Sequence, residues 1–143
     1  LQKYDESKKQ VVFATELPQF EPIKIVGLDY ESGILKLKLS QNVPAGWSQE
    51  FHNPRGGHSS IVGYGPERFE FRGNIASIGV RNDESFIQQI VNHAKNYVNA
   101  ANQGYVQQEK ARVRNEEQQR RVAFEKQIAE AEIRKNVLSN VKL

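Results

Sequence analysis

The sequence predicts an α+β protein: a small antiparallel β-sheet packed by one amphipathic helix and followed by a long C-terminal helical arm. Two observations support this fold class. Between residues 20 and 82, short apolar runs alternate with glycine, proline, asparagine and serine, which is typical of a meander of short strands. From residue 83 to residue 143 there is one glycine and no proline, and the apolar residues recur with helical spacing.

The first predicted elements are strands. Residues 1–10 are polar and we expect them to be frayed, with a first strand at 11–15. IKIVGL (23–28) and ILKLKL (34–39) flank the turn-forming stretch DYESG, so we expect an antiparallel hairpin. In the second run three leucines alternate with two lysines, which predicts one buried and one solvated face; these residues are Leu35, Lys36, Leu37, Lys38 and Leu39.

The middle of the chain predicts further short strands and no helix of three turns. The runs IVGY, RFEFR and IASIGV place these strands at about 61–64, 68–72 and 75–80, so that the sheet occupies about residues 11–81. Trp47 is the only tryptophan, and Phe51 follows it at a spacing of four. We expect Trp47 to anchor the long connection in the core rather than to serve as a platform for a substrate.

A helix is expected from about residue 83 to residue 103. Asn82 and Asp83 are good N-caps, and Glu84 lies in the first turn. One broad face is apolar and should pack on the sheet; its residues are Phe86, Ile87, Ile90, Val91, Ala94, Val98 and Ala101. Gly104 either ends this helix or weakens it. Residues 1–103 are therefore expected to form one small domain.

Residues 104–143 are predicted to be a helical oligomerisation arm. Residues 106–121 resemble a solvated spacer, with favourably ordered charge pairs Glu116–Arg120 and Glu117–Arg121. From residue 122 the helix is apolar on two opposite faces, and a monomer covers at most one of them. The expected interface consists of Phe124, Ile128, Ala131, Ile133, Val137 and Leu138. We expect a homo-oligomer built as a short helical bundle or an exchange of arms; the alternative is a hinged arm that packs back as two shorter helices.

Composition limits the possible functions. The chain lacks cysteine, which excludes disulfides, thiolate nucleophiles and cysteine-ligated zinc. Twenty Lys and Arg against 17 Asp and Glu give a net charge of +3, which is not the strong basic footprint of most nucleic-acid-binding domains. No apolar run is long enough for a membrane span. Because the chain begins at Leu1 and contains no methionine, we expect it to be a fragment of a larger protein.

The stretch HNPRGGHSSIVGYGP (52–66) has the composition of a site, with two of the three histidines and four of the ten glycines. Residues 57–61 approach the G-x-S-x-G nucleophile elbow, but Ile61 replaces the final glycine and no helix follows. The spacing of Glu50, His52 and His58 matches no recognised metal-ligand pattern, and the Walker A motif is absent. We therefore predict no catalytic residues, no metal and no cofactor.

Two functions remain. The first is a non-catalytic protein-interaction and oligomerisation module that uses the C-terminal helix. The alternative is a binding domain for nucleic acid or a phosphorylated or anionic ligand, through the Gly/His/Arg-rich loop 52–68. Its expected ligand-binding residues are Arg55, His58, Tyr64 and Arg68. Residues 62–69 share glycines, a tyrosine and a final phenylalanine with the RNP1 octet of RNA-recognition motifs, but DYESG leaves no room for the helix which that fold requires.

Overall fold

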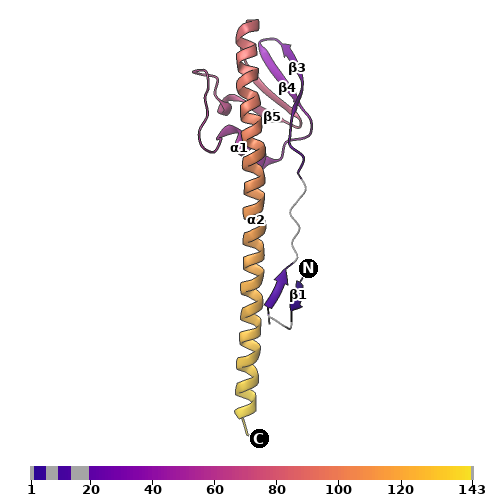
Figure 1. Ribbon diagram of the computed structural model, residues 1–143, viewed down its shortest axis with the longest axis vertical. Helices are drawn as coiled ribbons and strands as arrows, with labels where there is room; N and C mark the ends of the chain where they lie inside the picture. The colour runs from indigo at the N-terminus through magenta and orange to yellow at the C-terminus, as the bar shows by residue number, and fades with distance from the viewer. Residues whose placement is uncertain (1, 6–9, 14–19, 143) are drawn as a thin grey trace. The chain divides into compact units, whose positions relative to one another are not determined.

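The computed structural model describes residues 2–5, 10–13 and 20–142 (Figure 1). It divides into two units. The sheet unit comprises Gln19–Gln108, and the distal unit comprises Leu1–Pro18 together with Glu109–Leu143. The longest element, helix α2 (Glu84–Asn140), has 57 residues and contributes to both units. The α+β fold class predicted from the sequence is confirmed.

The sheet unit contains four antiparallel strands in the order β3-β4-β6-β5. Their bounds are β3 Ile25–Glu31, β4 Ile34–Leu39, β5 Glu70–Arg72 and β6 Ile75–Gly79. The predicted hairpin of β3 and β4 is confirmed, with Glu31 paired to Ile34. Its two turn residues, Ser32 and Gly33, have φ angles of 52° and 77°, as a type I′ turn requires. This turn matches the twist of the strands and fixes their register.

The predicted faces of β4 are also confirmed. Leu35, Leu37 and Leu39 are at most 1% exposed, whereas Lys38 is exposed and Lys36 is half-buried. A slip of one residue would turn the whole leucine row to solvent, so burial of the leucines stabilises this register against its neighbours.

Three expectations about the remaining short elements need correction. Residues 61–64 form turns rather than a strand. The expected strand at 68–72 is shorter, because Pro66 begins a 3-10 helix, η1 (Pro66–Arg68), before β5 starts. Residues 2–5, expected to be frayed, form β1 (Gln2–Asp5), which pairs antiparallel with β2 (Gln10–Phe13).

A helix that the sequence did not predict, α1 (Ala45–His52), lies within the long connection. It has only 8 residues, too few for a clear helical period. Its spacing of four places Trp47 and Phe51 on one face, and both side chains are fully buried. The prediction that Trp47 is a core residue is therefore confirmed.

Helix α2 begins as the sequence predicted. The Asp83 carboxylate accepts a hydrogen bond from the Phe86 amide at 3.1 Å, which satisfies one of the free donors of the first turn. Six of the seven predicted core residues of this helix are buried and Ile87 is half-buried. Tyr97, which the prediction omitted, is also buried at 2% exposure. Gly104 does not end the helix.

The core of the sheet unit lies between one face of the sheet and the helices α1 and α2 (Figure 1). A polar bracket crosses this core. The Asn102 carbonyl accepts hydrogen bonds from the Ile23 amide at 2.9 Å and from the Trp47 indole at 2.8 Å, while its amide donates to the Ile23 carbonyl at 2.9 Å. The bracket ties α2 to α1 and to the chain that leads into β3.

The distal part of α2 is largely solvated. The predicted pair Glu117–Arg121 is present at 2.7 Å, whereas Glu116 pairs with Arg112 at 2.8 Å. Val113 is an exception to the predicted solvated spacer, because it is only 6% exposed. Among the helices of the described chain, none is both long enough and apolar enough to cross a membrane.

Candidate functional site

The glycine-rich loop between α1 and η1, residues 53–65, is held at a few points while most of its side chains face solvent. Gly56, Gly57 and Gly63 have φ angles of 79°, 88° and 84°, which residues with a side chain rarely adopt. Pro54 is buried. At the middle of the loop the Tyr97 hydroxyl donates a hydrogen bond to the Ser59 carbonyl at 2.7 Å. The loop is thus a structured connection anchored on α2.

Arg55, the first predicted ligand residue, forms an ion pair within the sheet unit. Its Nε lies 2.6 Å from Glu50 Oε1, and a second guanidinium nitrogen lies 3.3 Å from Oε2. Glu50 is only 9% exposed and receives a further hydrogen bond from the Gln108 amide at 3.5 Å. The hydrogen bond to Glu50, followed by its negative charge, raises the pKa of Arg55. The charge of Arg55 is therefore largely offset by Glu50.

His58, the second predicted residue, lies against Tyr97 with the two rings 5.8 Å apart and nearly perpendicular. His93 stacks on Tyr97 at 6.3 Å, and its Nδ1 lies 3.5 Å from the Ser59 hydroxyl. Burial is the main cause that raises the pKa of Tyr97, and the negative charge of Glu67 raises it further, whereas a hydrogen bond with Ser60 lowers it. The phenol is thus kept protonated beneath the loop.

We expect Tyr97 to make the protein sensitive to alkaline pH. Its folded pKa is raised, so its contribution to stability is fully present below the unfolded pKa of about 10 and is lost as the pH rises through the folded pKa. The difference between the 295 nm titrations of the native protein and Tyr97→Phe should show a midpoint above 10. A midpoint at or below 10 would contradict the proposed burial effect.

Tyr64 and Arg68 are brought together. With Gly63, Ile78 and Gly79 they line a shallow depression of about 460 Å³ at the end of β6. The Tyr64 ring packs edge-on against the Phe86 ring, with the two centroids 4.8 Å apart. The Arg81 guanidinium lies over the same Phe86 ring, 4.2 Å from its centroid. Arg68 is exposed, and no carboxylate pairs with it within the described part of the chain.

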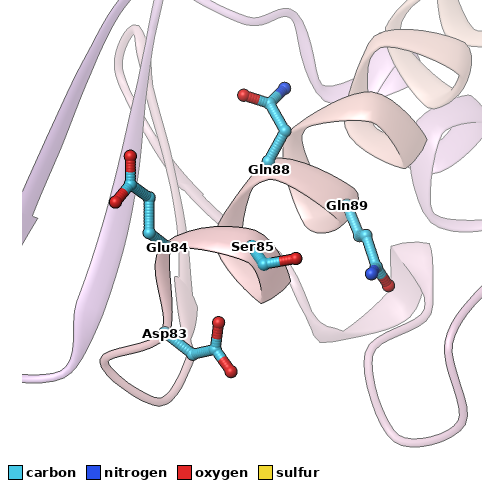
Figure 2. Close-up of a pocket in the computed structure, with 5 residues that line it drawn as sticks. All are labelled: Asp83, Glu84, Ser85, Gln88 and Gln89. Atoms are coloured by element: carbon cyan, nitrogen blue, oxygen red, sulfur yellow. The ribbon is translucent and has the colours of Figure 1, made fainter.

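A second depression, of about 540 Å³, lies at the first turn of α2 (Figure 2). Figure 2 shows that its five lining side chains are all polar and come from one short segment; they are Asp83, Glu84, Ser85, Gln88 and Gln89. The Asp83 carboxylate already caps the helix, and Glu84 adds negative charge at the positive end of the helix dipole. These carboxylates disfavour an anion there.

The third feature is the distal end of α2. Six large aliphatic side chains between residues 122 and 141 are 42–64% exposed; they are Val122, Ile128, Ile133, Val137, Leu138 and Val141. Ala131 is exposed as well, and Phe124 is half-buried. Four of the six predicted interface residues are thus large exposed apolar side chains.

Of the four predicted ligand residues, the structure brings together Tyr64 and Arg68, while Arg55 and His58 contact different partners. Sequence reasoning missed Ile78 and Gly79, which also line the depression, because their position depends on the register of β6 rather than on a local motif. Within residues 2–5, 10–13 and 20–142 no group of three or more His, Asp or Glu could hold a metal ion. Comparisons with protein-family models, curated proteins and solved structures found no match for this chain.

Proposed function

We propose that this chain is a non-catalytic oligomerisation module in which residues 122–141, the distal end of α2 and the residue after it, pair with the same residues of a second copy. The observation that supports this function is the exposure of six large aliphatic side chains within 20 residues: five at the distal end of α2, and Val141 directly after it. Single exposed apolar residues are ordinary on a protein surface, but a concentration of large ones in one short segment marks an interaction site.

The same residues need a partner for energetic reasons. Burial of apolar surface contributes about 25 cal/mol per Å², or roughly 1.5–3 kcal/mol for a fully buried large aliphatic side chain. A helix stabilised only by its own hydrogen bonds is marginal in water, and most helices in proteins depend on packing of an apolar face. Association of two or more copies would supply that packing to residues 122–141.

The charges of this segment favour an antiparallel second copy. Residues 122–132 contain Glu125, Glu130 and Glu132 against one basic residue, Lys126. Residues 133–142 contain three basic residues and no acidic one; they are Arg134, Lys135 and Lys142. Antiparallel pairing places the acidic half of one copy beside the basic half of the other and opposes the two helix dipoles, whereas parallel pairing places like charges together.

The two apolar faces indicate more than one neighbour for each helix. At about 100° per residue, Ile133 and Val137 lie on one face, whereas Ile128 and Leu138 lie on the opposite side. Lys135 interrupts the heptad spacing between Ala131 and Leu138, which disfavours a long coiled coil. A short bundle with antiparallel neighbours buries both faces.

Size-exclusion chromatography with light scattering tests the oligomer. At tens of micromolar the full chain should elute with at least twice its mass of 16.3 kDa. The double variant Ile133→Lys/Val137→Lys should be monomeric, because two buried charges cost several kcal/mol at an interface. Gln118→Lys/Gln119→Lys adds the same charge to exposed positions of α2 outside the segment and should leave the mass unchanged. A monomeric native chain would contradict the proposal.

The absence of native cysteine makes the orientation easy to test. In an antiparallel pair a cysteine at Glu132, near the middle of the segment, lies close to its copy, whereas a cysteine at Ser139 lies far from its copy. Oxidation should therefore cross-link Glu132→Cys and leave Ser139→Cys monomeric in denaturing gels. Efficient cross-linking of Ser139→Cys would show parallel pairing instead.

A further inference from the structure

The depression at Tyr64 and Arg68 adjoins an unpaired stretch of strand edge on β6. Along an antiparallel strand, the amide and carbonyl groups of successive residues point alternately to the two neighbouring strands. Hydrogen bonds from Leu39 to Asn74 and from Val80 to Gly33 show that the even-numbered residues of this segment face β4. The odd-numbered residues, including Gly79, therefore face the side of β5.

Strand β5 begins too late in the chain to reach Gly79. The last register pair at this end of the two strands joins Glu70 to Ser77, so the residue that would lie opposite Gly79 is Arg68. Arg68 belongs to η1, and its amide donates to the Gly65 carbonyl at 3.1 Å. Among the described residues, no hydrogen-bond partner is found for Gly79 on this side. Its amide and its carbonyl therefore face the side that β5 leaves open, and Gly79 lines the depression.

Three hydrogen-bond donors without protein partners thus line one depression. They are the Gly79 amide, the Arg68 guanidinium and the Tyr64 hydroxyl; within the part of the chain that the structure describes, no hydrogen bond or ion pair occupies either side chain. Glu67 lies next to them in sequence, but its carboxylate is placed over Gly65 and acts on Tyr97. Convergent donors of this kind recognise an anion.

We propose that this depression binds the C-terminal carboxylate of an extended peptide. The last residue of the peptide pairs with Gly79. The amide of this peptide residue donates a hydrogen bond to the Gly79 carbonyl, and one of its carboxylate oxygens accepts a hydrogen bond from the Gly79 amide. The second carboxylate oxygen accepts hydrogen bonds from Arg68 and from the Tyr64 hydroxyl. The peptide thereby adds a short antiparallel strand to β6 beyond the first residue of β5, a known mode of peptide recognition.

The backbone of Gly79 favours a peptide over a phosphate group. Gly79 offers an acceptor as well as a donor. A phosphate monoester dianion has no hydrogen to give to the acceptor, and inorganic phosphate has acidic hydroxyl hydrogens but no amide that could continue a strand. A peptide carboxylate with its own preceding amide satisfies both groups at once. Gly79 also leaves room for the last side chain of the peptide, because only the Gly33 carbonyl oxygen, at 3.9 Å, lies within 4 Å of a Cβ built there.

The neighbouring residue indicates what that side chain is. In an antiparallel sheet, residues directly opposite each other point to the same face. Ile34 is paired with Gly79 and is 41% exposed, so a peptide residue opposite Gly79 lies on the face of Ile34. Because Gly79 has no side chain, an apolar C-terminal residue of the peptide, such as valine, would reach over it and cover part of Ile34.

The test is an NMR titration of the full ¹⁵N-labelled chain with the peptide acetyl-Ala-Ala-Val ending in a free carboxylate. The Gly79 amide and the Arg68 Nε resonance should shift saturably. The same peptide with a C-terminal amide should bind at least tenfold more weakly, because it lacks the charge that Arg68 recognises. Inorganic phosphate at equal ionic strength should cause smaller shifts at Gly79.

Variants separate recognition from general charge. Arg68→Gln should weaken binding at least tenfold, and Tyr64→Phe several-fold, since the phenyl ring retains the contact with Phe86. Arg72→Gln removes the charge of another exposed arginine, on β5, and should leave binding unchanged. Equal affinity for the amide peptide, or undiminished binding to Arg68→Gln, would overturn the proposal. Saturable binding of phosphate tighter than that of the peptide would replace it with a phosphate site.

Discussion

Replacing Asn102 with leucine is expected to lower the free energy of unfolding by about 3–5 kcal/mol, because each polar group left unpaired in a core costs about 1–3 kcal/mol. Three groups lose their partner at once: the Ile23 amide, the Ile23 carbonyl and the Trp47 indole N–H. Leucine has a higher helix propensity than asparagine, so the helix itself would gain a few tenths of a kcal/mol. A large loss would therefore come from the polar bracket and not from the helix.

Chemical denaturation of both variants measures this effect. Asn99→Leu makes the same exchange three residues earlier on α2, at an exposed position, and should change stability by less than about 0.5 kcal/mol. If Asn102→Leu were as stable as Asn99→Leu, the bracket would not contribute to the fold.

Replacing Leu37 with alanine is expected to cost about 2–4 kcal/mol, the usual range for truncation of a buried leucine. Leu37 is fully buried in β4, and its strand neighbours are Leu28 and Ala76. The cavity left by the truncation would lie at the centre of the sheet, where backbone hydrogen bonds on both sides prevent collapse. Urea unfolding monitored by Trp47 fluorescence would report the loss.

Lys38→Ala provides the matched control for the sheet. Lys38 follows Leu37 on the same strand but is exposed, so its truncation should change stability by less than about 0.5 kcal/mol. Equal costs for the two substitutions would mean that the leucine row does not face the core.

Elements with a repeated local pattern could be predicted from the sequence. The alternation of leucine and lysine predicted the buried and exposed faces of β4. The N-cap at Asp83 predicted where α2 begins, and the apolar stripe of this helix predicted its packed face. Helix α1 was not predicted, because two helical turns contain too few residues to show a clear periodicity. Its apolar anchors, Trp47 and Phe51, were recognised individually but not as one helical face.

The candidate sites were harder to predict, because they depend on contacts between distant residues. Composition directed attention to the loop 52–68, and within this loop Tyr64 and Arg68 line one depression. The partner of Arg55 is five residues away, but only the helical turn of α1 brings Glu50 to it. Gly79 belongs to the site because β5 begins only at Glu70, and no single-residue pattern encodes that point.

Two glycines lie where α1 and α2 approach each other, and they link positions that are far apart in the chain. A methyl group on Gly104 would overlap the Glu50 carboxylate, and one on Gly46 would overlap the Gln108 side chain. Alanine at position 104 would favour the helix by about 1 kcal/mol, yet it would push Glu50 away from Arg55. We therefore expect Gly104, Glu50 and Arg55 to covary during evolution: Gly104 should be replaced only together with the other two residues.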